Sequence, residues 1–381
     1  MKVFYGNYKL GIVGGGQLGR MLIQSAIDLN IDVHVLDPAP DAPCQAIAHQ
    51  FTRGSLTDFD TVYQFGKACD LVTIEIENVN TEALKRLRDE GVTVYPQPEI
   101  IELVQDKVVQ KRFYKEHNIP TSPFYEVANR QEVLNHADFI PMVNKLAREG
   151  YDGRGVQLIR KPEELSMAFD KPGLIEKLID FDREISVIVA RNAKGEIASF
   201  PAVELSFHPT ANLVEFLFAP ADISEKIATE AKRIAEDVIN KLNMTGLLAV
   251  EMFVTKQGEV LVNEIAPRPH NSGHQSIEAN MTSQYEQHLR AILNMPLGST
   301  KALIPSAMVN LLGEEGYSGE VRCDGIEEVL RTEGVHIHLY GKKETKPFRK
   351  MGHVTITDPD PEQLKIKARF VKDTLKIKSN D

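Results

Sequence analysis

The first 98 residues alternate short apolar runs with helical patterns, and this alternation constrains the fold more than any other feature of the sequence. Strands are expected at Tyr8–Val13, Asp32–Leu36, Leu71–Ile76 and Val92–Tyr95, and helices at Leu18–Leu29, near Thr57–Lys67 and at Thr81–Asp89. Neighbouring parallel strands need a crossover connection, which a helix usually supplies. Strand–helix repetition therefore predicts a doubly wound parallel sheet with helices on both faces.

A glycine-rich turn follows the first expected strand and opens the first expected helix. Gly14-Gly15-Gly16-Gln17-Leu18-Gly19 matches G-x-G-x-x-G, and Asp37 closes the next strand. One interpretation is an NAD-dependent oxidoreductase, in which the turn holds a pyrophosphate. The minimal interpretation is a helix N-terminus whose N–H groups bind an anion. Glu75 ends the third strand, so it either lies at the ligand-binding edge of the sheet or is only an exposed strand end.

A hairpin near residue 257 carries the main indication of a metal site. Strands are expected at Leu248–Thr255 and Glu259–Ile265. A two-residue loop at Gln257-Gly258 would place Glu251 opposite Glu264, with Cβ atoms ~5 Å apart. Facing carboxylates repel each other, and Mg²⁺ would compensate because it prefers carboxylates together with phosphate oxygens and water. The alternative is a solvated hairpin whose two glutamates point outward.

Three loops concentrate positive charge. Residues 267–274, after the second hairpin strand, carry an Arg and two His, which suits an anion-binding edge. Residues 148–155 combine two Arg with three Gly between expected strands, as in a lid that folds over phosphates. Residues 340–350 hold five Lys or Arg, either a solvated face or an anion site. Lys107 and Lys111, at i and i+4 of a helical pattern over Glu99–His117, are typical of a solvated face.

Length and composition exclude several classes of protein. A chain of 381 residues is expected to hold two or three domains. A net charge of −10 argues against general nucleic-acid binding, and no apolar run is long enough for a membrane span. The N-terminus has no apolar signal-peptide core, and Cys44, Cys69 and Cys323 form no disulfide or metal pattern. We therefore expect a reduced, cytoplasmic enzyme without nucleic-acid or membrane partners.

Taken together, the motifs resemble the ATP-grasp superfamily and, within it, the 5-(carboxyamino)imidazole ribonucleotide synthase family. The segments that carry the resemblance are GGGQLGRM, EIEN, QDK, GYDGRG, AVEMF, NEIAPRPHNSGH and YGKKETKPFRKMGH, in this order along nearly the whole chain. NEIAPRPHNSGH and the C-terminal segment are the most specific of them. The resemblance implies an α/β and α+β architecture with a Rossmann-like domain (1–98), an ATP-grasp domain (99–297, with a lid near 120–178) and a small β-rich C-terminal domain (298–381).

The resemblance also implies an activity and a set of site residues. The activity is ATP- and bicarbonate-dependent carboxylation of the amine of 5-aminoimidazole ribonucleotide, through carboxyphosphate, in purine biosynthesis. ATP contacts are implied for Lys107, Lys145, Gly150, Tyr151, Asp152, Gly153, Arg154, Gly155, Val156, Glu176, Lys177, Leu178, Ile179, Glu184, His208, Asn263 and Glu264. Mg²⁺ ligands are implied to be Glu251 and Glu264. Substrate contacts are implied for Gly16, Gln17, Leu18, Glu75, Tyr151, Asp152, Arg268, His270, Lys342, Arg349 and Lys350. Catalytic roles are implied for Asp152, Arg154, Arg268 and Lys342.

Three positions depart from the family pattern. Glu149 stands where another Gly is usual, Val156 where a polar residue is common, and Leu146-Ala147 where Thr-Arg is frequent. None of these changes removes a charge that the mechanism needs.

Other interpretations remain open at this stage. A sister ATP-grasp enzyme would use the same ATP residues on a different ribonucleotide or carboxylate. An NAD-dependent oxidoreductase would leave the glutamate pair and GYDGRG unexplained. A nucleotide sensor would bind ATP without turnover. The resemblance further implies a homodimer.

Overall fold

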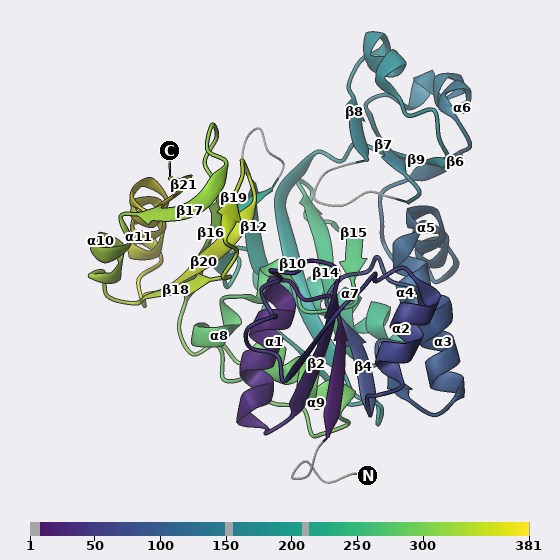
Figure 1. The fold of residues 1–381 in the computed structure, drawn as a ribbon. Coiled ribbons are helices and arrows are strands. Elements are labelled where there is room, and N and C mark those ends of the chain that lie inside the picture. The colour runs from purple at the N-terminus through teal and green to yellow at the C-terminus, as the bar shows by residue number, and fades with distance from the viewer. Residues whose placement is uncertain (1–7, 149–154, 208–212, 381) are drawn as a thin grey trace.

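The computed structural model describes residues 8–148, 155–207 and 213–380, and within these ranges the strands form four sheets (Figure 1). A nine-stranded sheet runs through the middle of the molecule, beside a five-stranded parallel sheet built from the N-terminal residues. A four-stranded sheet forms a lobe that stands apart from the rest, and a three-stranded sheet lies near the C-terminus. Among the described residues, no helix has both the length and the apolar character needed to cross a membrane.

The N-terminal sheet is parallel throughout, in the order β3-β2-β1-β4-β5, and confirms the predicted doubly wound fold. Its strands are β1 Lys9–Val13, β2 Asp32–Asp37, β3 Gln50–Arg53, β4 Leu71–Ile74 and β5 Thr93–Val94, and its helices are α1 Gln17–Asp28, α2 Phe59–Gly66 and α3 Thr81–Asp89. Strand β3 was not predicted. Its sequence, QFTR, has no apolar run because it lies at the edge of the sheet, with no residue buried.

Helices cover both faces of this sheet. Leu10 and Ile12 pack on one face against α1 and against α9 (Gln284–Ile292), a helix that is distant in the sequence. Val13 and Ile74 pack on the other face against α2 and α3. Helix α9 also packs through Ala291 against the nine-stranded sheet, so this one helix joins the two largest sheets.

The nine-stranded sheet has the order β15-β14-β10-β12-β13-β16-β20-β18, with β11 paired to β10, and all its ladders are antiparallel. Its strands are β10 Phe181–Arg191, β11 Ile197–Ser199, β12 Val203–Phe207, β13 Val214–Ala219, β14 Gly246–Thr255, β15 Val260–Ala266, β16 Ser306–Leu312, β18 Val335–Leu339 and β20 Lys350–Thr357. Because β13 pairs with β16, hydrogen bonding is continuous from the central part of the chain into the C-terminal part.

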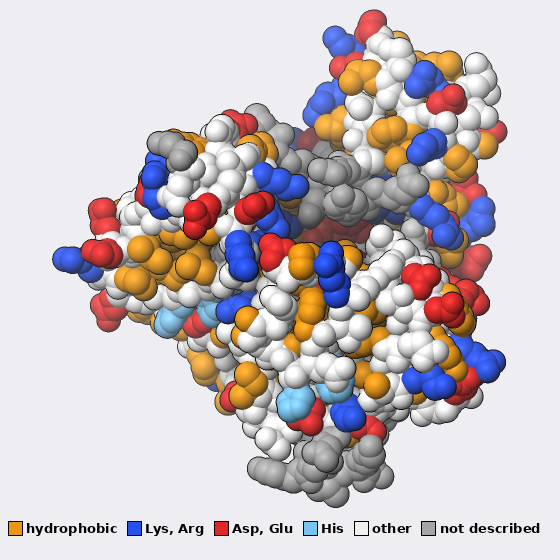
Figure 2. All heavy atoms as spheres, in the orientation of Figure 1, with side chains coloured by type: hydrophobic (Ala, Val, Ile, Leu, Met, Phe, Trp, Pro, Cys, Tyr) orange, Lys and Arg blue, Asp and Glu red, His pale blue; other side chains and the backbone are white. Residues whose placement is uncertain are grey.

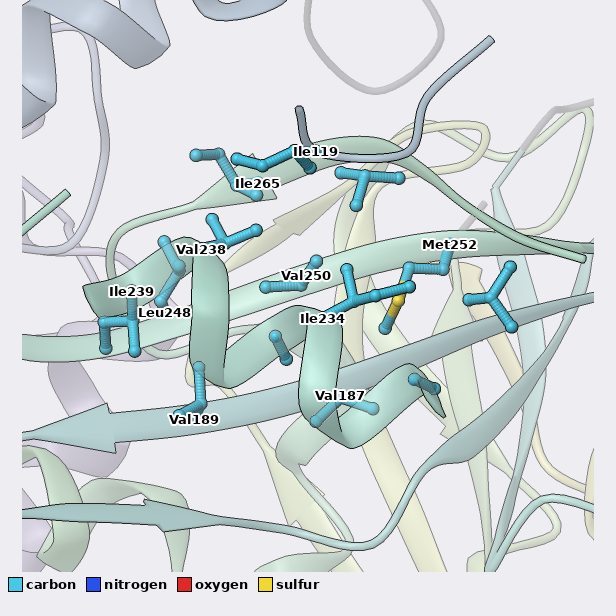
Figure 3. Packing of buried hydrophobic residues seen from close by; sticks show 14 of the residues in the cluster. Ile119, Val187, Val189, Ile234, Val238, Ile239, Leu248, Val250, Met252 and Ile265 are labelled. Carbon is cyan, nitrogen blue, oxygen red and sulfur yellow. The ribbon is translucent and has the colours of Figure 1, made fainter. Parts of the chain in front are cut away.

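The main core lies between this sheet and α7 (Glu225–Lys241). The Ser224 side chain caps α7, and Ile234 and Val238 point from it onto Val187 and Val250 of β10 and β14 (Figure 3). The apolar face of this amphipathic helix therefore closes the core.

The four-stranded lobe contains β6 Phe124–Val127, β7 Met142–Leu146, β8 Val156–Ile159 and β9 Gly173–Lys177, with α6 Arg130–Asn135, and has its own small core. Two helices lead into it, α4 Pro98–Gln105 and α5 Lys107–Glu116. The prediction of one helix over Glu99–His117 is wrong, because the backbone of Asp106 is extended and its side chain caps α5.

The C-terminal part packs a helix against the end of the nine-stranded sheet. Helix α11 (Pro361–Thr374) lies on β16 and β20, and α10 (Ile326–Leu330) packs against α11. The small sheet beside it has the order β19-β17-β21, from Glu344–Thr345, Gly319–Asp324 and Lys376–Ser379.

We expect Ile234→Ala to lower the free energy of unfolding by about 2–5 kcal/mol, because it leaves a cavity between α7 and the sheet. Lys232→Ala, on the exposed side of the same helix, should change it by less than about 0.5 kcal/mol. Guanidinium-induced unfolding of both variants measures the difference. Equal effects would show that α7 does not close the core.

Candidate active site

Glu251 of β14 and Glu264 of β15 lie directly opposite each other, as the sequence predicted. The predicted loop is nevertheless wrong: Thr255 pairs with Glu259, so three residues form the turn. From Val254 to Met252 each residue therefore pairs one position away from its predicted partner. A bulge between Glu251 and Met252 then restores the predicted pairing of Glu251 with Glu264. Asn263 is the extra residue of this bulge, and bulges re-aim side chains beside functional sites.

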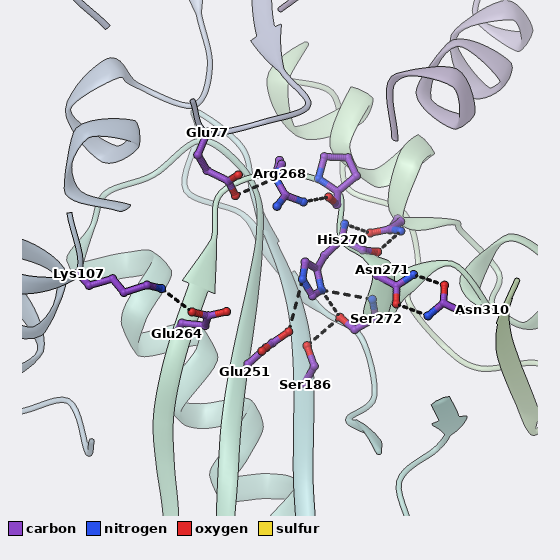
Figure 4. Close-up of polar contacts among 12 residues, drawn as sticks. Glu77, Lys107, Ser186, Glu251, Glu264, Arg268, His270, Asn271, Ser272 and Asn310 are labelled. Carbon is purple, nitrogen blue, oxygen red and sulfur yellow. Dashed lines mark hydrogen bonds and ion pairs between the residues drawn. The ribbon is translucent and has the colours of Figure 1, made fainter. Parts of the chain in front are cut away.

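The bulge brings both Asn263 and Glu264 within reach of lysines. Lys107 Nζ donates to Glu264 Oε2 at 2.8 Å (Figure 4), and Lys145 Nζ donates to Asn263 Oδ1 at 3.0 Å. The Lys107 ammonium group lowers the pKa of Glu264 to about 2. Thus one carboxylate of the facing pair is already compensated by a cation of the protein.

The other carboxylate is compensated much less. Burial raises the pKa of Glu251 well above its ordinary value, and the charges of Glu264 and Glu184 raise it further. His270 Nε2 lies 3.4 Å from Glu251 Oε1, and the charges of Lys107 and Lys350 oppose the rise of the Glu251 pKa only in part. A buried carboxylate facing a second carboxylate fits a divalent cation, and phosphate oxygens and water would supply the remaining ligands of Mg²⁺.

Glu184 lies on the same face of the sheet as this pair. Ser186 of β10 pairs with Glu251 of β14, so their side chains lie on the same face. Glu184 is two residues before Ser186, and alternate residues of a strand share a face. Burial raises the pKa of Glu184 to about 7, and the neighbouring Glu264 contributes to the shift.

The segment from Glu176 to Ile179 leads from the four-stranded lobe back to the central sheet. Glu176 is buried, and its carboxylate binds Lys145 and Lys111 at 3.0 Å each. The N–H groups of Lys177 and Leu178 donate to the carbonyl oxygens of Pro123 and Pro141. Two main-chain donors of this segment, for which the resemblance implies ATP contacts, therefore hold it to the lobe.

The glycine turn binds carboxylates of the protein itself. Gly16 and Gly19 donate their N–H groups to the two oxygens of Glu75 at 2.7 and 2.8 Å, and Gly15 donates to Asp37 Oδ2 at 2.7 Å. A Cβ at Gly16 would lie 2.5 Å from Glu75 Oε1, so this approach requires glycine. The N–H groups that would hold a pyrophosphate are occupied, which argues against the NAD interpretation. Burial raises the pKa of Glu75, although the two N–H groups oppose this shift.

The basic C-terminal loop reaches the start of α1. Lys342 Nζ donates to Gln17 Oε1 at 3.1 Å and to the carbonyl oxygen of Lys350 at 2.7 Å. Arg349 Nη1 donates to the carbonyl oxygen of Glu344 at 2.7 Å. The side chain of Leu18 is buried in the core, which leaves only its main chain for a ligand. Residues 325 apart in the sequence thus meet at the glycine turn.

The loop after β15 connects the glutamate pair to the N-terminal sheet (Figure 4). Arg268 Nε lies 2.8 Å from Glu77 Oε1, and His270 Nδ1 lies 2.9 Å from Ser272 Oγ. Ser272 Oγ is also 2.8 Å from Ser186 Oγ, and Asn271 and Asn310 exchange two hydrogen bonds of 2.9 Å. Sequence reasoning missed Glu77, Ser186, Ser272 and Asn310, because only the packing of the loop after β15 against segments distant in the sequence brings them together.

Part of the predicted site lies outside the described residues, namely Gly150 to Arg154, and His208. Gly155 has a φ of +72°, and Val156 begins β8 directly opposite Lys145. In the view of Figure 2 the molecule is hollowed between the four-stranded lobe and the other parts, and Lys and Arg side chains gather along the margin of the hollow.

Comparison with known proteins identifies the family. Three family models match: a ribonucleotide synthetase preATP-grasp domain over residues 8–105, an ATP-grasp domain over 112–285, and a phosphoribosylaminoimidazole carboxylase C-terminal domain over 306–367. The N5-carboxyaminoimidazole ribonucleotide synthase of Bacillus subtilis is 35% identical over 371 residues, which cover 95% of each chain. The chain spans 63% of the length of longer relatives such as the chloroplastic phosphoribosylaminoimidazole carboxylase of Vigna aconitifolia.

Solved structures agree with this assignment. The N5-carboxyaminoimidazole ribonucleotide synthetase of Thermotoga maritima is 43% identical with a TM-score of 0.91, and the match covers 98% of this chain and 100% of that one. The synthase of Aspergillus clavatus, in complex with ADP and 5-aminoimidazole ribonucleotide, is 34% identical with a TM-score of 0.88, over 96% and 98% of the two chains. The chain therefore belongs to the N5-carboxyaminoimidazole ribonucleotide synthase family of ATP-grasp enzymes, which are ATP-dependent ligases.

Proposed function

We propose that the protein carboxylates the amine of 5-aminoimidazole ribonucleotide with bicarbonate at the expense of ATP, a step of purine biosynthesis. The observation that carries this proposal is the contact between Glu251 and His270. It joins the glutamate pair, which suits a metal–phosphate complex, to the Arg268–His270 loop, which suits an anionic acceptor. A phosphoryl donor and its acceptor must bind next to each other, because phosphoryl transfer depends on positioning and charge neutralisation.

The ATP half of the site would be built around the hairpin. Lys107 and Lys145 are placed to neutralise phosphate charge, and Glu251 and Glu264 would hold Mg²⁺. When bound, Mg²⁺ supplies positive charge at the transferring phosphoryl group. Glu184 would accept hydrogen bonds from ribose hydroxyls, and the segment Glu176–Ile179 would face the adenine. The loop 150–156 and His208 complete this half as proposed contacts.

The acceptor half would be built around the glycine turn. Gln17, together with the main chain of Gly16 and Leu18, would contact the ribonucleotide, and Glu75 would support that turn from behind. Arg349 and Lys350 suit its phosphate, since guanidinium groups bind phosphate through two parallel hydrogen bonds. Arg268, His270 and Lys342 would bind bicarbonate and then carboxyphosphate.

The proposed reaction has two stages. A bicarbonate oxygen attacks the γ-phosphorus of ATP, which gives carboxyphosphate and ADP, while Lys145 and Arg154 stabilise the developing charge. Carboxyphosphate then releases CO₂ and phosphate, and the substrate amine attacks CO₂ to form the new C–N bond. Asp152 would hold the amine and accept its proton. Because carboxyphosphate hydrolyses readily, the loop around Tyr151 and Gly153 would have to exclude water.

Further features of the protein stay predictions. We propose domains over residues 1–98, 99–297 and 298–381, with a lid near 120–178. The nine-stranded sheet crosses the last boundary through β13 and β16. A homodimer, a cytoplasmic location and the lack of a nucleic-acid partner are likewise proposals.

The decisive test is ADP release from Mg-ATP and bicarbonate, with and without 5-aminoimidazole ribonucleotide. We expect strong stimulation by the ribonucleotide that depends on bicarbonate. ADP release indifferent to the ribonucleotide would move the substrate to another compound of the ATP-grasp class. Absence of ADP release under all conditions would favour a nucleotide sensor.

We expect Glu264→Gln to reduce ATP turnover by at least about a hundredfold while the fold is retained, because the variant removes one of the two charges proposed for the metal. Glu259→Gln, an exposed glutamate at the other end of the hairpin, is the matched control and should keep normal turnover. Circular dichroism checks the fold. Normal turnover in Glu264→Gln would exclude this metal site.

We expect Arg349→Ala to raise the KM for the ribonucleotide by about ten- to a hundredfold and to leave the KM for ATP nearly unchanged, because a bidentate phosphate contact is lost. Lys346→Ala, an exposed cation of the same loop, should change neither constant. Steady-state kinetics with each substrate varied in turn measures both. Equal losses for the two substrates would place Arg349 outside the acceptor half.

A further inference from the structure

Lys111 is buried beside the proposed ATP site, but none of the ligand contacts proposed above involves it. Only 3% of its side chain is exposed, so the prediction of a solvated face for Lys107 and Lys111 is wrong. Its ammonium group donates to Thr121 Oγ1 at 2.5 Å and to Ser122 Oγ at 3.1 Å, and lies 3.0 Å from Glu176 Oε2. Lysine is rarely buried without a compensating partner, so its place needs an explanation.

Lys111 lies where the chain enters and leaves the four-stranded lobe. Thr121 and Ser122 precede β6, the first strand of the lobe, and Glu176 belongs to β9, the last. The Ser122 hydroxyl donates to Glu176, and the Lys177 N–H group donates to the Pro123 carbonyl oxygen, so the two crossings are tied together. Thr121 also donates to the carbonyl oxygen of Val262, next to the bulge residue Asn263. Lys111 thus contacts both connections at the base of the lobe.

The charges in this region form an alternating row. Glu176 lies between two cations, with Lys111 Nζ 3.0 Å from Oε2 and Lys145 Nζ 3.0 Å from Oε1. Although burial raises the pKa of Glu176, Lys145 and Lys111 together lower it to about 2, so the group is a carboxylate at neutral pH. The row Lys111, Glu176 and Lys145 therefore carries one net positive charge.

The net charge of this row determines how strongly Lys145 can attract an anionic ligand. With Lys111 present, one lysine balances Glu176 and the charge of the other is free to act on phosphate. Without Lys111, the row is neutral, and of the two lysines that contact Glu176 directly only Lys145 remains. The attraction between buried opposite charges is strong because the surroundings screen it weakly. Lys145 would then be held by Glu176 and would act less on the nucleotide.

We propose that Lys111 is a positioning residue that neutralises Glu176 and thereby leaves the charge of Lys145 available for the phosphates of the bound nucleotide. This inference rests on the proposed function, in which Lys145 contacts ATP. Lys111 itself touches neither the nucleotide nor the acceptor in this scheme.

The test is calorimetric titration of Mg-ADP into five full-length proteins: wild type, Lys111→Met, Glu176→Gln, the double variant Lys111→Met/Glu176→Gln, and Lys115→Met. Lys115 is exposed on the same helix and is the matched control. We expect Lys111→Met to weaken binding about tenfold, since one charge near the phosphates is lost. Glu176→Gln alters a residue of the proposed nucleotide site and therefore serves only as the reference for the double variant. The double variant, whose row again carries one positive charge, should bind Mg-ADP at least about threefold more tightly than Lys111→Met, and Lys115→Met should match wild type.

A purely structural role predicts a different pattern. If Lys111 and Glu176 only hold the base of the lobe together, both single variants bind weakly and the double variant binds no better than either. That pattern, or unchanged binding by Lys111→Met, would overturn the proposal. Should Lys111→Met fold poorly, Lys111→Gln takes its place in the same comparison, because its neutral amide can keep hydrogen bonds to the hydroxyl groups of Thr121 and Ser122.

The outcomes also separate this inference from the proposed function. The titration uses neither bicarbonate nor the ribonucleotide, so a wrong acceptor substrate leaves it unaffected. Failure of the wild type to bind Mg-ADP would overturn both proposals. If the wild type binds Mg-ADP but the double variant binds no better than the single variants, only the proposed role of Lys111 is overturned.

Discussion

Two carboxylates held face to face on neighbouring strands repel each other, and much of the structure around the hairpin responds to this repulsion. Lys107 lowers the pKa of Glu264, whereas the pKa of Glu251 is raised by burial and by the neighbouring carboxylates. The asymmetry leaves Glu251 as the less compensated carboxyl group of the pair. In the proposed function this pair would hold Mg²⁺, and Lys107 and Lys145, which bind Glu264 and Asn263, would neutralise phosphate oxygens of the nucleotide.

Helix α9 gives the site its rigid base. It packs between the parallel N-terminal sheet and the nine-stranded sheet, where His288 Nε2 lies 3.0 Å from Thr73 Oγ1. Burial lowers the pKa of His288 to about 3, so it is neutral at physiological pH and adds no charge to this contact. The glycine turn and the hairpin are consequently held in fixed relation, although they belong to different sheets. The two halves of the proposed site would then meet at the Arg268–His270 loop.

The sequence predicted the regular parts of the fold well and the irregular parts poorly, for identifiable reasons. Buried strands such as β1 and β4 carry apolar runs, so their pattern is plain. The edge strand β3 has no such run, and the break at Asp106 depends on one capping side chain. In the hairpin, Glu251 and Glu264 were paired correctly although the loop was one residue longer than predicted, because the bulge at Asn263 compensated.

By itself, the sequence determined which chemical groups the protein has: the carboxylate pair, the lysines, the glycine turn and the basic C-terminal loop, in an order that indicates the family. Only the tertiary structure decided what each group contacts. It showed that Glu75 and Asp37 fill the glycine turn, that Lys342 meets Gln17 across 325 residues, and that Lys111 is buried against Glu176. The physical reason is that periodicity reports the face on which a side chain lies, whereas its partner, its burial and hence its pKa depend on chain segments that pack against that face from elsewhere in the sequence.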